Sequence, residues 1–295
     1  MYPSIGIGVI CSLFGKSRQA WYESQERSTH EELAGVIVLK LVREIRQEMP
    51  RIGTQKLHHM LQSDFAAHNI KLGRDKFYEL LEQHGYLLRY RKRKPYTTDS
   101  SHRFKKYPNL IRDMLLSASG QLLVSDITYI RVGNGFNYLS LITDAYSRKV
   151  VGRCLWPSLE SKGALKALEM VLEGNKLSAK VIHHSDRGIQ YCCNDYVRRI
   201  EKAKIQLSMT EKGDPYENAI AERVNGILKM EFGLDAHFSS NISAQDAVEK
   251  AVELYNNRRP HASCDYLTPT IAHQMNGELK KRWVKSKWSK EKTEV

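Results

Sequence analysis

The order of strand-like and helix-like segments after about residue 107 is the feature that most restricts how this chain can fold. Three apolar, β-branched segments come first, and the turn sequence Gly133-Asn134-Gly135 joins the first two as a hairpin. Helical and strand-like segments then alternate, which is typical of α/β sheets. The expected strands are 122–130, 136–145, 149–156, 180–184 and 205–209, and the expected helices are 159–173, 195–204, 215–232 and 244–257.

The first hundred residues differ, because apolar residues recur there at helical spacing without strong strand signals. A helix, the break Gly15-Lys16-Ser17 and another helix outline a helix-turn-helix, and a second such unit follows. A plain helical bundle explains this pattern equally well. After residue 107, three antiparallel strands followed by alternating helices and strands is the order of a ribonuclease-H-like fold. We therefore predict an α/β ribonuclease-H-like core with a mixed five-stranded sheet, preceded by an all-α helix-turn-helix region.

The charge of the chain indicates the kind of partner it binds. Lys and Arg number 46 against 33 Asp and Glu, a formal net charge of +13, which favours nucleic acid over the substrates of a generic metabolic enzyme. With 41% hydrophobic residues the composition is globular, so the charge should lie on a folded body. Residues 88–106 interleave basic and aromatic side chains, and we expect a linker that lies along DNA. Its expected DNA-contacting residues include Arg89, Arg91, Lys92, Arg93 and Lys94.

Cysteine usage and hydropathy bear on location. The five cysteines form no C-x-x-C pair, and an odd number suggests no disulfide framework, so we expect a reducing cytoplasm. The apolar segment 5–14 is shorter than the ~20 residues that span a bilayer, and no basic segment precedes it. The sequence therefore predicts neither a signal peptide nor a membrane span.

Three carboxylates stand where chemistry is expected. Asp126 lies in the middle of an apolar strand, where a charge is unfavourable unless it binds something. Asp186 directly follows the fourth strand, and if the first and fourth strands are parallel neighbours the two side chains face one another. Two carboxylates that close repel unless a cation lies between them. Glu222 lies in a predicted helix that Asp214-Pro215-Tyr216-Glu217 should begin.

Glu222 belongs to a polar stripe on that helix, separate from its apolar face; the stripe consists of Asn218, Glu222, Asn225 and Lys229. A single Glu of this kind is usually solvated, and Glu217 is the alternative third carboxylate, although its capping position already explains it. Oxygen ligands without cysteine favour Mg²⁺ or Mn²⁺ over zinc. Two such ions about 3.5–4 Å apart support in-line phosphoryl transfer. A basic protein with this site should act on nucleic-acid phosphodiesters.

With these residues the chain resembles the OrfB-type transposases of the insertion-sequence-three family of bacterial mobile elements, whose catalytic core is of the retroviral-integrase type. The resemblance covers nearly the whole chain, and 35 residues separate Asp186 from Glu222, the interval that names this catalytic class. Mild departures are Leu123, Arg223-Val224 and Cys264-Asp265, where the family usually has Trp, Ser-Phe and Leu-Gly. The matching motifs include Asp126-Ile127-Thr128-Tyr129-Ile130, Asp144 with Ser147-Arg148, His184-Ser185-Asp186-Arg187-Gly188, Glu217-Asn218-Ala219 with Ala221-Glu222, Leu228-Lys229, Tyr255-Asn256 and Leu267-Thr268-Pro269.

The resemblance implies that Asp126, Asp186 and Glu222 are the catalytic, metal-binding triad, with two Mg²⁺ (or Mn²⁺) ions per active site. It implies a DDE transposase catalytic subunit that binds element terminal inverted repeats, cuts one strand to free a 3′-hydroxyl and joins that hydroxyl to target DNA. It also implies a partner, the helix-turn-helix and leucine-zipper protein of the upstream frame, separate or fused. We expect a homo-oligomer on DNA, in the bacterial cytoplasm at the nucleoid, with no membrane contact.

Further residues near the triad are expected to contact DNA. Lys212 and Lys229 flank the triad and are expected to hold phosphate, with Arg187 and Asn218 as further DNA contacts. Two alternatives remain open: a hydrolysis-only ribonuclease-H-type nuclease, and a noncatalytic DNA-binding regulator. The expected domains are a helix-turn-helix-like segment (1–28), a helical DNA-binding domain (29–87), a basic linker (88–106), the integrase-type core (107–275) and a basic C-terminal tail (276–295).

Overall fold

The computed structural model describes residues 6–88, 103–112, 114–174, 177–211 and 218–282. Contacts divide the chain into two compact units, one holding the five N-terminal helices and the other holding all the strands that the model describes. No helix in these ranges combines the length and the apolar character that crossing a membrane requires. The basic segment from Arg89 to Lys94, and Lys212, lie outside the described residues.

The N-terminal unit consists of the helices α1 (Ile7–Leu13), α2 (Arg18–Glu48), α3 (Thr54–Met60), α4 (Gln62–Ala67) and α5 (Arg74–Gln83). The helical segments expected on either side of residue 28 form one continuous helix, α2, because no proline interrupts them. Its one glycine, Gly35, lies where α5 passes, and a Cβ there would be 3.5 Å from Leu80 Cδ1. The core of the unit is apolar and fully buried, with Val38, Val42, Leu57, Leu61, Phe77 and Leu81.

The second unit is built on a mixed sheet with the strand order β3-β2-β1-β4-β5, which confirms the five strands predicted from the sequence. β1 pairs antiparallel with β2 and parallel with β4, and β4 pairs parallel with β5. A short strand that the sequence pattern did not indicate, β6, pairs with the far end of β1. The strands are β1 (Leu122–Val132), β2 (Gly135–Asp144), β3 (Val150–Trp156), β4 (Ile182–Ser185), β5 (Gln206–Met209) and β6 (His237–Phe238).

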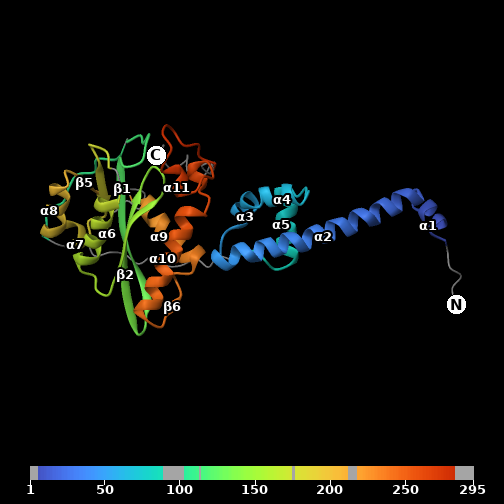
Figure 1. Cartoon of the computed structure of the whole chain (residues 1–295), viewed down its shortest axis with the longest axis horizontal. Helices are drawn as coiled ribbons and strands as arrows, with labels where there is room; N and C mark the ends of the chain where they lie inside the picture. Colours follow the sequence, from blue (N-terminus) through green and yellow to red (C-terminus); the bar gives the residue numbers. More distant parts are fainter. Residues whose placement is uncertain (1–5, 89–102, 113, 175–176, 212–217, 283–295) are drawn as a thin grey trace, which may run out of the picture. The chain divides into compact units, whose positions relative to one another are not determined.

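Helices cover both faces of this sheet (Figure 1). One face packs against α6 (Ser161–Gly174), α7 (Ile189–Cys192) and α8 (Asn194–Lys202), and the other against α9 (Ala219–Phe232) and α10 (Asn241–Asn257), with α11 (Pro269–Ala272) beside α10. Alternate residues of β1 serve the two layers: Leu123 joins the α6–α8 side and Ile130 the α9–α10 side. The layers are therefore those of the predicted ribonuclease-H-like α/β fold.

The start of α9 corrects one expectation. The sequence predicted a helix from Pro215, but α9 begins at Ala219 with Asn218 as its N-cap. Asn218 has φ −116° and ψ 21°, outside the helical region, and its side chain donates to the Ser125 carbonyl in place of capping the helix. The contact with β1 thus replaces the local capping signal. The predicted capping residues Asp214 to Glu217 lie outside the described residues.

Candidate active site

Asp126 is held in the middle of β1 by hydrogen bonds to both of its carboxylate oxygens. The Ile127 backbone N–H donates to Oδ1 at 2.9 Å, and the Asn225 amide Nδ2 donates to Oδ2 at 2.8 Å. Asp126 is on the sheet face that α9 covers, whereas its neighbour Ser125 points to the opposite face and meets His183. Alternation along one strand therefore directs this half-buried carboxylate toward α9.

Asp186 follows the carboxyl end of β4, the strand parallel to β1. The register pairs Val124 with His184, so Asp126 and Asp186 each stand two residues further along adjacent strands. The Gly188 backbone N–H donates to Asp186 Oδ1 at 3.0 Å. A Cβ at position 188 would lie 2.9 Å from that oxygen, so a larger residue there would have to displace the carboxylate. The turn Asp186-Arg187-Gly188 thus orients Asp186 beside β1.

Glu222 comes from the first turns of α9 and is the most exposed of the three carboxylates. The helix is fixed to the sheet by apolar side chains, since Val224, Ile227 and Leu228 are buried against residues of β1, β2 and β3. Burial and the nearby Asp186 raise the pKa of Glu222 above its ordinary value. The three carboxylates predicted from separate parts of the sequence therefore lie within electrostatic reach of one another.

Electrostatics single out Asp126. Burial raises its pKa to about 7, with Asp186 and Glu222 adding to the increase, while the hydrogen bonds from Asn225 and the Ile127 N–H lower it. Like charges are thus held together against their repulsion, and a cation would relieve it. The donor set, three carboxylates and no thiolate, fits a hard divalent ion such as Mg²⁺ or Mn²⁺. Within the described ranges, no three His, Cys, Asp or Glu side chains lie together as a group that could hold a metal ion.

The histidines next to Asp186 have other partners. His183 is fully buried, with Nε2 at 2.7 Å from Ser125 Oγ and 2.9 Å from the Tyr196 hydroxyl. Burial, with a contribution from His184, lowers the pKa of His183 to about 3, so the ring is neutral and its role is structural. His184 points to the other face, and its Nδ1 lies 2.8 Å from Ser208 Oγ.

Two polar residues near the carboxylates are buried. Asn218, expected to contact DNA, is 5% exposed, and its Nδ2 donates to the Ser125 carbonyl at 3.0 Å. Asn225, grouped with Glu222 on a polar stripe, is also 5% exposed and contacts Asp126. The only sequence feature that could have indicated this contact is the position of Asn225, three residues after Glu222 on the same helix face. Arg187 directly follows Asp186, and Lys229 lies seven residues after Glu222 on α9; both are half-buried.

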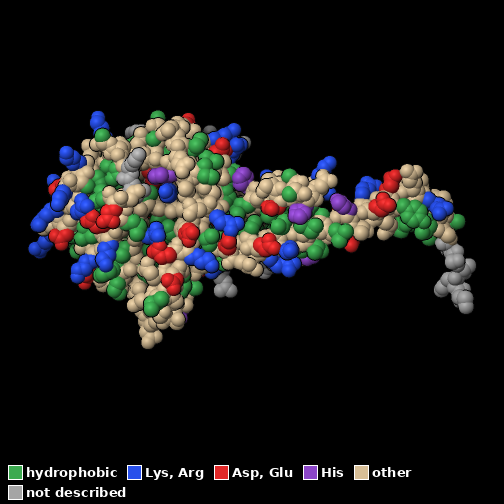
Figure 2. All heavy atoms as spheres, in the orientation of Figure 1, with side chains coloured by type: hydrophobic (Ala, Val, Ile, Leu, Met, Phe, Trp, Pro, Cys, Tyr) green, Lys and Arg blue, Asp and Glu red, His purple; other side chains and the backbone are tan. Residues whose placement is uncertain are grey.

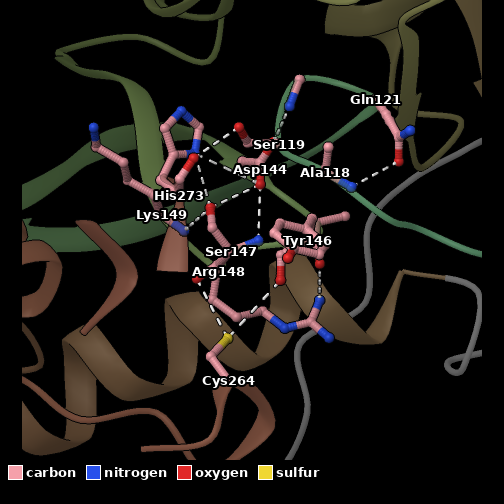
Figure 3. A network of polar contacts seen from close by, with 12 residues as sticks. Ala118, Ser119, Gln121, Asp144, Tyr146, Ser147, Arg148, Lys149, Cys264 and His273 are labelled. Atoms are coloured by element: carbon pink, nitrogen blue, oxygen red, sulfur yellow. Dashed lines mark hydrogen bonds and ion pairs between the residues drawn. The ribbon is translucent and has the colours of Figure 1, made fainter. Parts of the chain in front are cut away.

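A fourth carboxylate, Asp144, belongs to a different polar network at the end of β2 (Figure 3). Its Oδ1 accepts from the Ser147 N–H at 2.8 Å and the Ser147 hydroxyl at 2.7 Å, and its Oδ2 accepts from the Gly120 N–H at 2.7 Å. His273, directly after α11, places Nδ1 3.0 Å from Ser147 Oγ and 3.8 Å from Asp144 Oδ1. This network joins the segment before β1, the β2–β3 turn and α11, so its role is structural.

Acid is expected to remove the stabilisation that Asp144 provides. Burial raises the pKa of Asp144, but His273 and the hydrogen bonds from Ser147 and Gly120 outweigh it, and the net pKa is lowered. A carboxylate with a lowered folded-state pKa stabilises the fold above the unfolded-state pKa of about 3.9 and loses that effect as the pH falls through this value and below. Asp144→Asn should therefore lower the free energy of unfolding by about 1–3 kcal/mol at pH 7, and by progressively less below about pH 4.

Urea denaturation between pH 7 and pH 3 measures this difference. The exposed Asp246 on α10 offers a matched control, since Asp246→Asn should leave the free energy of unfolding nearly unchanged at every pH. If the difference in the free energy of unfolding between the wild type and Asp144→Asn stays constant down to pH 3, the lowered pKa of Asp144 is contradicted.

Comparison with known proteins places this arrangement among related chains. Two protein-family models, each described as an integrase core domain, match residues 117–215 and 203–269. The 31 kDa protein of insertion element IS600 from Shigella sonnei is 30% identical over 274 residues, which cover 90% of this chain and 99% of that protein. The transposase InsF of insertion sequence IS3A from Escherichia coli is 28% identical over 269 residues, covering 89% of this chain and 92% of InsF.

Among solved structures, the catalytic core domain of HTLV-2 integrase in complex with magnesium superposes with a TM-score of 0.44 at 17% identity. It covers 53% of this chain and 98% of that domain.

Proposed function

Because this chain belongs to the IS3-family transposases, whose members carry an integrase core domain, we propose that it is the DDE catalytic subunit of an insertion sequence. The proposed subunit binds the terminal inverted repeats of its element and cuts one strand by metal-assisted hydrolysis. It then joins the freed 3′-hydroxyl to a phosphodiester of the target DNA. Both steps are in-line displacements at phosphorus, so one site serves both, and joining needs no energy input because one phosphodiester replaces another.

The grouping of Asp126, Asp186 and Glu222 carries this proposal. Each comes from a different part of the sheet region: β1, the residue after β4, and α9. Burial, with a contribution from neighbouring carboxylates, raises the pKa of both Asp126 and Glu222. We propose that the three side chains hold two Mg²⁺ (or Mn²⁺) ions. Bound ions of this kind supply a stronger nucleophile and stabilise charge on the attacking and leaving oxygens. The hydrogen bonds from Ile127, Asn225 and Gly188 orient the carboxylates for this task.

The surface charge supports DNA as the substrate. Figure 2 shows Lys and Arg side chains along the edge of the second unit at α8, where Arg198, Lys202 and Lys204 are exposed. Basic side chains in this position neutralise phosphates without reading sequence. We propose that Arg187 and Lys229 contact DNA nearer the carboxylates. The upstream-frame helix-turn-helix and leucine-zipper protein, the homo-oligomer on DNA and residues 107–275 as the catalytic domain are parts of the same proposal.

A strand-joining assay tests the proposal. Labelled DNA that carries the element ends is incubated with target DNA, Mg²⁺ or Mn²⁺ and the full chain, with and without the upstream-frame protein. The expected result is a nicked element end together with a joined product, both dependent on the divalent ion. Nicking without joining in every condition would favour a hydrolysis-only nuclease. Binding alone, unaffected by Mg²⁺, would favour a noncatalytic regulator.

A further inference from the structure

The Asp126 carboxylate on β1 accepts a hydrogen bond from a different element, the side-chain amide of Asn225 on α9. Asn225 lies on α9 and Asp126 on β1, and Nδ2 donates to Oδ2 at 2.8 Å. The other donor to this carboxylate, the Ile127 N–H, belongs to β1 itself and moves with the strand. Only the helix contact can therefore fix the carboxylate relative to α9.

The two hydrogen bonds leave Asp126 able to bind a cation. Each carboxylate oxygen has two lone pairs, and each oxygen accepts one described hydrogen bond. One lone pair of each oxygen stays available, and the two donors fix the plane in which those lone pairs lie. Asp126 thus has a set orientation that does not depend on a bound ion.

The Asn225 amide has a defined orientation. Its NH₂ group faces Asp126 and donates to Oδ2, so its carbonyl Oδ1 points away from that carboxylate. That Oδ1 is buried and has no hydrogen-bond partner among the residues that the structure describes. A buried polar atom without a partner is unfavourable. Asn225 thus carries this cost while its NH₂ group bonds Asp126.

We infer that Asn225 is a positioning residue for the proposed phosphoryl transfer: its amide fixes the plane of the Asp126 carboxylate and ties it to the helix that carries Glu222. Asn225 follows Glu222 by three residues, about one turn of α9, so one hydrogen bond couples the β1 carboxylate to the α9 carboxylate. This inference rests on the proposed function, because it assigns Asn225 a task in the metal-binding group.

Metal binding without DNA tests the role of Asn225 directly. Asn225→Leu removes the donor with little change in volume, and Mn²⁺ affinity of the full chain is measured by electron paramagnetic resonance titration. We expect Mn²⁺ to bind about 10-fold or more weakly, as is typical when a side chain that orients a metal ligand is lost. In the cleavage assay kcat should fall while KM for DNA stays within about twofold. Asn225→Gln keeps an amide donor and should recover part of the Mn²⁺ affinity.

Asn256 provides a matched control for a merely structural effect. It is also a buried asparagine that ties a helix to the sheet, since its amide on α10 bonds both the N–H and the C=O of Val150 on β3, each at 2.9 Å. Asn256→Leu should lower the melting temperature while leaving Mn²⁺ affinity of the folded protein unchanged. Should Asn225→Leu not fold, Asn225→Ala carries the same expectations.

Two results would overturn the inference: wild-type Mn²⁺ affinity and kcat in a folded Asn225→Leu variant, or an equal loss of Mn²⁺ affinity in Asn256→Leu. Failure of the proposed function has a different signature. In that case the wild-type chain would not bind Mn²⁺, or Asp186→Asn would bind it equally well.

Discussion

Asp126→Asn is expected to reduce strand cleavage and strand joining by about 10³-fold or more, equivalent to about 4 kcal/mol of activation free energy. The change keeps the shape of the side chain but removes the charge at the centre of the three-carboxylate group, whose members interact electrostatically. Asp186→Asn and Glu222→Gln should give losses of the same order, because the proposed ions need all three ligands. The assay with labelled element ends measures both products for each variant.

The same substitution should not weaken the fold. Burial and its neighbours raise the pKa of Asp126 to about 7, so the ionised form is disfavoured in the folded protein. A raised folded-state pKa means that ionised Asp126 subtracts from stability once the pH exceeds the unfolded-state value. The melting temperature of Asp126→Asn at pH 8, without divalent ions, should therefore equal or exceed that of the wild type. If Asp126→Asn is inactive and also melts at a lower temperature than the wild type, the loss of activity is explained by impaired folding. If the variant stays active, Asp126 has no role in the reaction.

Arg259→Met is expected to lower the free energy of unfolding by about 3–5 kcal/mol. Arg259 and Glu231 form a bidentate ion pair, with Nε and Nη2 each 2.8 Å from a carboxylate oxygen, and their side chains are only 1% and 7% exposed. The Arg259 guanidinium also lies over the Tyr255 ring, 5.7 Å from its centroid. Removing the arginine takes the bidentate ion pair away from the buried Glu231 carboxylate, and that desolvated charge is the source of the large effect.

Thermal and urea denaturation of three variants separate this explanation from others. The exposed pair Arg112–Glu211 has Nη2 and Oε2 3.0 Å apart, and its side chains are 67% and 42% exposed. Arg112→Met should therefore change the free energy of unfolding by less than about 1 kcal/mol. The double variant Glu231→Leu with Arg259→Met should recover much of the stability lost by Arg259→Met alone, since it leaves no unpaired charge. Equal effects at the buried and exposed pairs would contradict the prediction.

The sequence pattern was enough to locate the carboxylates and the central sheet. A charge in the apolar strand around Asp126, a carboxylate after the fourth strand and the interval to Glu222 are local or countable features, and the structure places all three on the predicted elements. The pattern predicted five strands of a ribonuclease-H-like sheet, with the first and fourth as parallel neighbours only as a condition of that fold. The structure supplied the strand order and this pairing. Helix α9 began four residues later than its capping signal indicated, because Asn218 contacts β1.

Contacts between residues far apart in the chain are what no local pattern could supply. Asn225 meets Asp126 across 99 positions, Ser147 meets His273 across 126 positions, and Arg259 meets Glu231 across 28. The two-residue strand β6 likewise exists only because β1 extends far enough to pair with it. The sequence by itself determined which elements form and which residue types they carry, since helical and strand periodicity and turn chemistry are properties of neighbouring residues. Only the tertiary structure decided which side chains orient the carboxylates and which charges are buried, because that depends on how the helices pack on the sheet.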